Sequence, residues 1–403
     1  MARAQHARSL RGLDLINLSL ADVRDGIGPF LGIYLLSVHH WNLRDIGMVS
    51  SIATFSGVLV QTPAGAVVDR LKNKKIIIAI ASLIIGFGTL LILIKPNYTV
   101  VIISQVLVGM AATFVGPAIA GMTLGLVSYK KLEHRTGRNE MFNHGGNVGS
   151  ALISGLIGYT IGLQGIFVFT LVLSLASVAC LQLIDQKEIN HDLSRGCLPS
   201  EEKQSGSQSR KVIMQPLFII FTACCVLYHF ANAAMLPLAG QYIVSENKVD
   251  ASVYMSACIV IAQLVMVPTA AWCSRRSVSG RKWLLLVCFA ILPIRGLLYT
   301  ASADPFFITA VQILDGASAG IFGVVSILVI ADLTKGSGHF NFANGILITA
   351  VGLGASFSNV TAGYIAGAFS FRAAFVFLAA VAAVAFVICL FFMKETLKPD
   401  ISE

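Results

Sequence analysis

Residues 65–75 read GAVVDRLKNKK and join two apolar runs, residues 45–68 and 76–94. Asp69 and Arg70 close the first run, and Lys72, Lys74 and Lys75 lead into the second. Each run is close to the roughly 20 apolar residues that a helix needs to cross a bilayer. The stretch therefore predicts a short charged loop between two membrane-spanning helices.

The composition extends this interpretation to the whole chain. Of 403 residues, 56% are hydrophobic and 12% are charged, and the mean hydropathy is +0.79. Soluble domains carry about 25% charged residues, so a secreted module, a nucleic-acid binder and a cytosolic enzyme are excluded as first choices. We expect an all-α membrane protein with twelve spans, at residues 12–38, 45–68, 76–94, 99–128, 139–163, 165–184, 213–244, 251–273, 282–302, 305–333, 341–368 and 372–393.

The distribution of basic residues predicts the orientation. With both termini on one side, that side collects 23 of the 29 lysines and arginines, and the other side collects 4. This asymmetry places both termini in the cytoplasm, and we expect the chain to lie in the inner (plasma) membrane. It also accounts for the net charge of +9 without a nucleic-acid partner. The basic N-terminus leads into a long apolar run with no cleavage site, which predicts a retained first helix rather than a signal peptide.

The chain divides into two halves that share residues at a nearly constant offset. A polar linker at residues 185–212 separates a six-helix bundle at 1–184 from a second one at 213–403. PFLGIY at 29–34 matches PLAGQY at 237–242, and Gln105 with Gly109 matches Gln312 with Gly316. Parallel six-helix repeats build alternating-access transporters, whose binding site lies at the interface of the repeats near the midplane.

The loop at 65–75 resembles the G-x-x-x-D-R-x-G-R-R/K signature of the major facilitator superfamily, with Lys72 in place of the usual glycine. The resemblance implies a bacterial-type transporter with two six-helix bundles related by pseudo-two-fold symmetry. It also implies a conformational latch, for which the expected residues are Gly65, Asp69, Arg70, Arg275 and Asp332. We expect Asp332 to pair with Arg275 or Arg276, and the lysines of the loop to be solvated. The alternative for Asp69 is a solvated loop residue that only sets topology.

Three charges lie near the middle of the first predicted span, namely Asp22, Arg24 and Asp25. Each costs about 2.5 to 3.5 kcal/mol at a helix centre in lipid, so this segment should face a wet cavity or ion partners. A buried structural ion network is the alternative. Gly26, Gly28 and Pro29 follow at once and predict an interruption of the helix.

Further polar residues occur inside apolar segments. Asn143, Asn147, Ser150 and Ser154 form one stripe at helical spacing, which indicates a cavity lining or hydrogen bonds between helices. The predicted substrate-binding residues are Asp22, Arg24, Asp25, Gln105, Asn143, His144, Asn147, His229, Asn232 and Gln312. For His229, packing and proton carriage stay equally open.

The candidate proton-coupling residues are Asp22, Asp25 and Asp315, because burial raises the pKa of a carboxyl group. Arg295 is expected near the outer end of its helix, where a long side chain can reach the interface. The eight cysteines have no paired spacing and are interpreted as packing residues.

These features favour a secondary active transporter that moves a small solute, with protons as the coupling ion. No G-x-x-x-x-G-K-[ST] loop is present, and no cofactor or metal site is expected. Arg24 with amide and hydroxyl groups suits an organic anion or polar metabolite, such as a carboxylate siderophore. A cation, transition-metal or multidrug substrate, and a membrane sensor without flux, remain alternatives. Degraded antiporter motifs favour export only slightly, and a monomer in the lipid bilayer is expected.

Overall fold

The computed structural model describes residues 2–24, 27–194, 214–247, 251–334 and 340–397. Every regular element within these ranges is a helix, so the expected all-α class is confirmed. The chain forms two compact units, Met1–Tyr34 with Ile52–Glu202, and Leu35–Ser51 with Lys203–Glu403. The second unit therefore includes a short piece of the N-terminal half, which a division at the linker does not anticipate.

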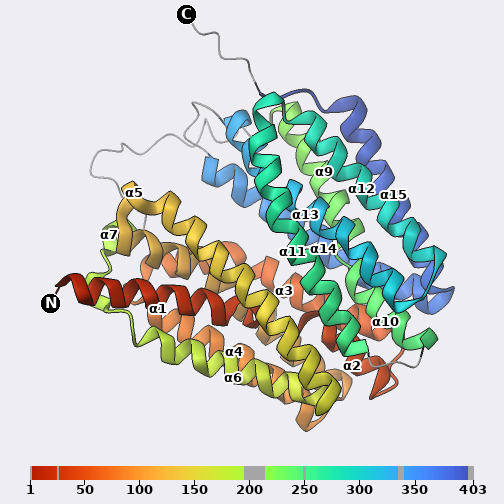
Figure 1. Cartoon of the computed structure of the whole chain (residues 1–403), viewed down its shortest axis with the longest axis horizontal. Coiled ribbons are helices and arrows are strands. Elements are labelled where there is room, and N and C mark those ends of the chain that lie inside the picture. Colours follow the sequence, from red (N-terminus) through yellow and green to blue (C-terminus); the bar gives the residue numbers. More distant parts are fainter. Residues whose placement is uncertain (1, 25–26, 195–213, 248–250, 335–339, 398–403) are drawn as a thin grey trace, which may run out of the picture. The chain divides into compact units, whose positions relative to one another are not determined.

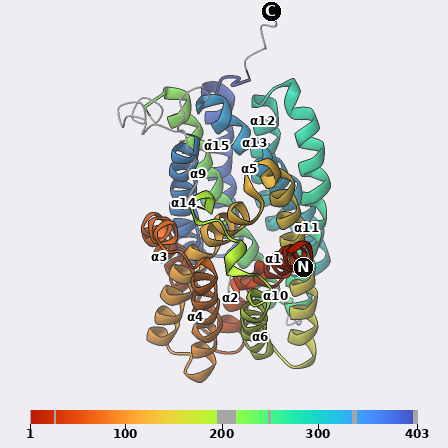
Figure 2. The same ribbon diagram turned by 90° about the vertical axis from the view of Figure 1, so that its left-hand side faces the viewer.

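The first unit contains the helices of the N-terminal half (Figure 1). Their bounds are α1 Ala2–Val23, α2 Gly28–Ser37, α3 Leu43–Arg70, α4 Lys74–Ile94, α5 Tyr98–Thr160, α6 Gln164–Leu181, η1 Gln186–Glu188 and α7 His191–Ser194; the ends of α2 and α3 nearest residues 35–51 belong to the second unit. Figure 2 shows α4 and α6 running alongside each other. The core between α1, α4 and α5 is aliphatic and includes Leu13, Ile78 and Val115, each with no exposed surface.

Helix α5 covers two of the expected spans without a break in helical structure. The side-chain amide of Asn139 donates to the hydroxyl of Thr123 over 2.9 Å. In a straight helix, residues 16 positions apart would be separated by about 24 Å. The helix therefore doubles back between these two residues and supplies two antiparallel segments, as the predicted spans 99–128 and 139–163 require.

The start of the predicted linker is folded rather than loose. Ile189 is 3% exposed and belongs to the aliphatic core of the first unit. The backbone amide of Asn190 donates to the carbonyl of Gly125 over 3.0 Å. A flexible linker from residue 185 is therefore wrong for residues 185–194, because one apolar side chain and one backbone contact fix them on α5. The remainder, residues 195–212, lies outside the described residues.

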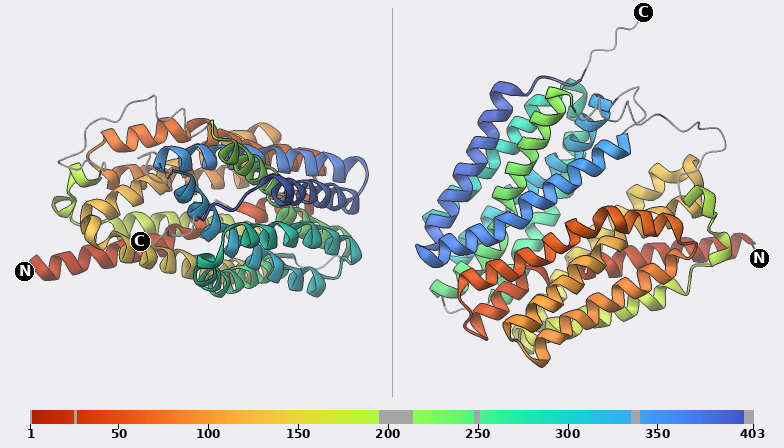
Figure 3. Two further views of the ribbon diagram at one scale, coloured as in Figure 1. Left: turned by 90° about the horizontal axis from the view of Figure 1, so that it is seen from above. Right: turned by 180° about the vertical axis from the view of Figure 1, so that it is seen from behind.

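The second unit contains the helices of the C-terminal half. Their bounds are α9 Pro216–Asn232, α10 Met235–Asn247, α11 Ala251–Arg276, η2 Ser277–Ser279, α12 Lys282–Ala301, α13 Pro305–Thr334, α14 Phe340–Ala368 and α15 Phe371–Phe392. Figure 3 shows α9, α14 and α15 side by side in its right-hand view. Residues 35–51 also belong here, and the guanidinium of Arg44 lies 4.8 Å from the ring centre of Tyr364.

Ten stretches of the described residues are long and apolar enough to cross a membrane. They correspond to ten of the twelve expected spans. The expected spans 12–38 and 139–163 are not among them, because the first is charged and interrupted after Val23 and the second carries Asn143, His144 and Asn147. The length and hydropathy of the helices therefore do not confirm the expected total of twelve membrane spans.

The two units repeat one close contact between helices at equivalent positions. A Cβ atom on Gly146 of α5 would lie 2.2 Å from the carbonyl oxygen of Leu18 on α1. A Cβ atom on Gly354 of α14 would lie 2.5 Å from the carbonyl oxygen of Val226 on α9. Both residues of the second pair are offset by 208 from those of the first. The repeat found in the sequence is therefore also a repeat of helix packing.

Candidate substrate and proton site

A charged and polar cluster lies inside the second unit, centred on Arg295 of α12. This arginine is 1% exposed. Its Nη1 atom donates to Oδ1 of Asp315 on α13 over 2.6 Å and to Oδ1 of Asn232 on α9 over 2.6 Å. The expectation that Arg295 reaches the membrane interface is wrong, because its helix places it against two neighbouring helices that supply acceptors.

Two more polar side chains complete this cluster, which we call the Arg295 cluster: Arg295, Asp315, Asn232, Gln312 and Tyr299. Nε of Arg295 donates to the Tyr299 hydroxyl over 3.1 Å, and Nη2 donates to Oε1 of Gln312 over 3.4 Å. Nε2 of Gln312 donates to the same hydroxyl over 2.5 Å. Every side chain thus has a partner, which a buried polar network needs in order to be stable.

The two charged members differ in their access to solvent. The Arg295 side chain is 1% exposed, whereas the Asp315 side chain is 17% exposed. A proton or a polar group can therefore reach the carboxylate more easily than the guanidinium. Because one positive charge faces one negative charge, the cluster is formally neutral while Asp315 is ionised.

The structure thus brings together three of the predicted site residues, Asn232, Gln312 and Asp315. Tyr299 was not predicted as a site residue, and Arg295 was expected near the outer end of its helix. A signal for both was present, since an arginine in the middle of an apolar segment has a tyrosine one helical turn later.

His229 lies on α9 but bonds within its own helix. Its Nδ1 atom lies 3.2 Å from the carbonyl oxygen of Cys225. Its ring packs edge-on against Phe322, with 4.7 Å between ring centres. These contacts favour the packing interpretation over proton carriage.

In the first unit, the predicted charged residues lie where α1 ends. Gly28, which starts α2, has a φ of 37°, a conformation that glycine adopts readily. The predicted interruption of the helix is confirmed by the separate helices α1 and α2. Asp22 and Arg24 are partly exposed, and Nη2 of Arg24 lies 3.9 Å from where a Cβ atom on Gly116 would be. Asp25 lies outside the described residues.

The remaining predicted substrate residues of this unit all belong to α5. Gln105 is 6% exposed, whereas Asn143, His144 and Asn147 are partly exposed. The amide of Asn143 donates to Oε2 of Glu140 over 3.4 Å. Further along the polar stripe, Ser150 and Ser154 are 5% and 1% exposed. The stripe therefore runs from accessible amides into the packed interior.

The expected latch partner of Asp332 is wrong. Oδ2 of Asp332 accepts from Nε of Arg281 over 3.1 Å and from the Thr396 hydroxyl over 3.1 Å. Arg275 and Arg276 are exposed on the last turn of α11. Arg281 takes the place of Arg275 or Arg276 because the chain turns after α11, and this turn leads to Arg281 immediately before α12.

The turn at Gly280 and Arg281 is held in place by Glu395, and this positions Arg281 for its ion pair with Asp332. Oε1 of Glu395 accepts from the backbone amide of Arg281 over 2.8 Å. Gly280 has a φ of 134°, and a Cβ atom there would lie 2.7 Å from Oε2 of Glu395. Both the backbone conformation and the close carboxylate therefore require glycine at this position.

The loop that defines the resemblance is only partly solvated. Lys74 has no exposed surface, and its Nζ atom donates to the carbonyls of Val68 and Leu71 at the end of α3. The expectation of a solvated Lys74 is therefore wrong, since the lysine caps that helix. Arg70 is exposed, and a Cβ atom on Gly65 would meet no atom within 4 Å. The side chain of Asp69 lies outside the described residues.

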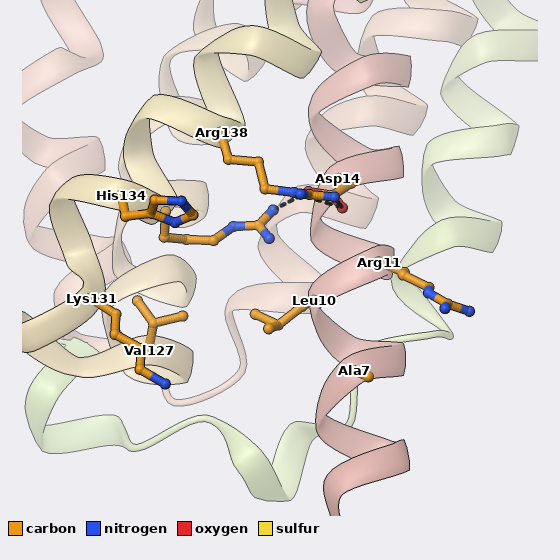
Figure 4. A pocket seen from close by; sticks show the side chains of 9 residues that line it. Ala7, Leu10, Arg11, Asp14, Val127, Lys131, His134 and Arg138 are labelled. Carbon is orange, nitrogen blue, oxygen red and sulfur yellow. Dashed lines mark hydrogen bonds and ion pairs between the residues drawn. The ribbon is translucent and has the colours of Figure 1, made fainter.

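A second ion cluster, with Asp14 and Arg135 buried and Arg138 exposed, joins α1 to α5 in the first unit. Oδ1 of Asp14 accepts from Nη2 of Arg135 over 2.5 Å, and Oδ2 accepts from Nη2 of Arg138 over 2.8 Å. These three residues line a cavity of about 320 Å³, and Figure 4 shows Asp14 and Arg138 pointing toward each other. In the sequence, the two arginines indicate only the orientation of the chain, and no pattern distinguishes Asp14.

His, Cys, Asp and Glu side chains do not gather in groups of three that could hold a metal ion anywhere in the described part of the chain. The polar groups that do gather are those of a guanidinium with carboxylate and amide partners.

The ten long apolar helices found among the described residues define a multi-pass membrane protein. The family model for the Major Facilitator Superfamily matches residues 14–293 and 221–403. The chain belongs to this superfamily.

Known proteins agree with this membership. Two uncharacterized MFS-type transporters of Mycobacterium tuberculosis, from strains H37Rv and CDC 1551 / Oshkosh, are each 41% identical over 398 residues, covering 98% of this chain and 95% of theirs. A crystal structure of a mutant of the nucleoside transporter NupG has a TM-score of 0.79 and 14% identity, covering 97% of this chain and 100% of that one. The second likeness concerns the fold alone.

Proposed function

We propose that this protein is a proton-coupled secondary transporter of a small organic anion, such as a carboxylate metabolite or siderophore, working by alternating access. The observation that carries the proposal is the bond of 2.6 Å between Arg295 and Asp315 deep in the second unit. The guanidinium of this pair is 1% exposed, and holding a charge inside an apolar helix bundle is costly. A transport cycle that breaks and remakes it gives a reason for that cost.

The coupling step is an exchange of partners at Arg295. While Asp315 is ionised, it neutralises the guanidinium. When Asp315 takes up a proton, Arg295 loses its counter-ion and becomes a site for the carboxylate of a solute. Asn232 and Gln312 already contact Arg295 and can hydrogen-bond the incoming group. Arg24, Asp22 and Asp25 are proposed as further solute and proton contacts in the first unit, together with Gln105, Asn143, His144 and Asn147.

The replacement of Asp315 by a solute carboxylate at Arg295 also predicts the direction of transport. Proton binding at Asp315 promotes anion binding at Arg295, so both move together. Co-transport of this kind uses an inward proton gradient for uptake. The cluster therefore supports uptake against the slight preference for export that the degraded antiporter motifs suggest.

We also propose twelve spans, an inner-membrane location, cytoplasmic termini and a monomeric state. The 23-to-4 asymmetry of basic residues supports the orientation. In this proposal the two further spans are α1 with α2 and the second segment of α5, whose helical structure supports the assignment.

A ligand-stabilisation screen of the purified protein tests the substrate class. We expect citrate or a related polycarboxylate to raise the melting temperature of the wild type and to lose this effect in Arg295→Gln and Arg24→Ala. Arg275→Ala serves as the control, since that arginine is exposed at the end of α11. Stabilisation by divalent metal ions and by no organic anion would support the cation alternative instead.

A further inference from the structure

The cavity beside Asp14 has the composition of an anion site. Four of its lining residues carry a positive charge and one carries a negative charge: Arg11, Lys131, Arg135 and Arg138 against Asp14. His134 also lines the cavity. Because Asp14 is already shared by two guanidiniums, it cannot neutralise the site.

Free hydrogen-bonding capacity remains at the opening of the cavity. The Arg135 side chain is 6% exposed and Arg138 is 47% exposed, although both contact Asp14. The outer guanidinium can therefore bind a further oxyanion without giving up its carboxylate. Lys131 and His134 are exposed on the same turn of α5.

The lower part of the cavity wall is apolar. Ala7 and Leu10 come from α1, and Val127 comes from the end of the first segment of α5. Figure 4 shows Leu10 and Val127 facing each other, with the amino group of Lys131 beside Val127, while Arg11 points away from them. A ligand that fills this space needs both an anionic group and an apolar part.

The cavity lies where the apolar sequence of a predicted span gives way to charged residues. Val127 belongs to the apolar helix stretch of α5, and the basic residues begin at Lys130, three positions further along the sequence. On the proposed orientation this is the cytoplasmic boundary, where anionic lipids concentrate and where basic pockets between helices bind their headgroups.

We infer that this cavity binds the headgroup phosphate of an anionic phospholipid, with the glycerol and upper acyl region against Leu10 and Val127. Arg138 and Lys131 hold the phosphate. Bound in this way, the lipid joins α1 to the turn of α5 next to the Asp14 ion cluster. The inference uses the proposed orientation and is independent of any transported solute.

Lipid binding to the full-length protein in detergent tests the inference. The wild type, Lys131→Glu and Lys72→Glu are titrated with phosphatidylglycerol and with phosphatidylcholine, and bound lipids are counted by native mass spectrometry. The control lysine is exposed on the loop after α3 and does not line the cavity. Both substitutions change the charge equally.

We expect the wild type to prefer phosphatidylglycerol, Lys131→Glu to weaken that binding by about tenfold or more, and Lys72→Glu to leave it within about twofold. Equal weakening in both variants would show a general surface field and overturn the site. Binding of inorganic phosphate to the wild type without lipid, lost in Lys131→Glu, would assign the cavity to a soluble anion and overturn the lipid assignment.

Melting in the absence of added lipid verifies that the variants are folded, and Lys131→Gln replaces Lys131→Glu if the latter is not. The lipid-binding experiment does not depend on solute flux. Failure of solute transport therefore leaves this result standing, and failure of lipid binding leaves the proposed function standing.

Discussion

Nη1 of Arg295 lies 2.6 Å from Oδ1 of Asp315, and the two side chains differ sharply in exposure, 1% against 17%. This asymmetry means that the two charges are not equivalent. Without its carboxylate, the guanidinium stays buried with only neutral partners. Without the guanidinium, the carboxylate can be hydrated or protonated.

The first prediction concerns this asymmetry. We expect Asp315→Asn to destabilise the protein by about 3 to 5 kcal/mol and Arg295→Gln to cost less, because only the former leaves a buried unpaired charge. The double variant should be more stable than the sum of the single effects predicts. Thermal unfolding in detergent measures all four proteins. Strict additivity would show that the pair is not coupled.

The second prediction uses the duplicated glycine contacts. Gly354→Ala and Gly146→Ala should each cost about 1 to 3 kcal/mol, because the new methyl group would meet a backbone carbonyl that cannot move aside. Gly345→Ala on α14 and Gly149→Ala on α5 are the matched controls, since a Cβ atom there meets nothing within 4 Å.

The controls should be neutral or gain up to about 1 kcal/mol from better helix propensity. Melting temperatures of the four variants decide the matter. A control as unstable as its partner would mean that the effect comes from the helix itself and not from the contact between helices.

The third prediction identifies the partner of Asp332. Arg281→Gln removes the ion pair and should lower stability by about 1 to 3 kcal/mol. Arg275→Gln should change it by less than about 0.5 kcal/mol, because that side chain is exposed. Denaturation of the two variants under one condition measures the difference. Equal losses of stability in Arg281→Gln and Arg275→Gln would contradict the assignment of Arg281 as the partner of Asp332.

The fourth prediction concerns Glu395, which follows the last span. Burial alone would raise the pKa of Glu395, but hydrogen bonds from the backbone amides of Arg281, Leu397, Lys282 and Thr396 outweigh it and lower the pKa below its usual range. A lowered pKa in the folded state stabilises the fold above the ordinary pKa of a glutamate, about 4.3, and this stabilisation is lost as the pH falls through the folded value.

Glu395→Gln should therefore lose stability relative to the wild type at neutral pH, and the gap between them should close in acid. Melting curves from pH 7 down to about pH 3 measure this gap. A gap that stays constant with pH would contradict the assigned role of the carboxylate.

Much of the fold could be predicted from the sequence, because apolar runs and their flanking charges report directly on bilayer crossing. Asn232, Gln312 and Asp315 were identified for a similar reason, since polar side chains are rare inside such runs. Position along the chain does not say which helix faces meet. For that reason the predicted position of Arg295 and the predicted partner of Asp332 were both wrong.

Ile189 shows a different limit. Its segment is polar overall, and one buried side chain carries no periodicity that could be recognised. The cavity beside Asp14 could not be predicted, because Asp14 is separated from Arg135 by 121 positions in the sequence and from Arg138 by 124. Such pairs become visible only when α1 and α5 are packed together.

Flux in proteoliposomes with an imposed pH gradient tests the central claim most directly. The anion that stabilises the purified protein is added outside, and a trapped pH-sensitive dye reports proton entry. For the wild type we predict anion uptake with internal acidification. Asp315→Asn should abolish the dependence of uptake on the pH gradient. Anion-independent pH traces, or gradient-driven uptake unchanged in Asp315→Asn, would contradict the account.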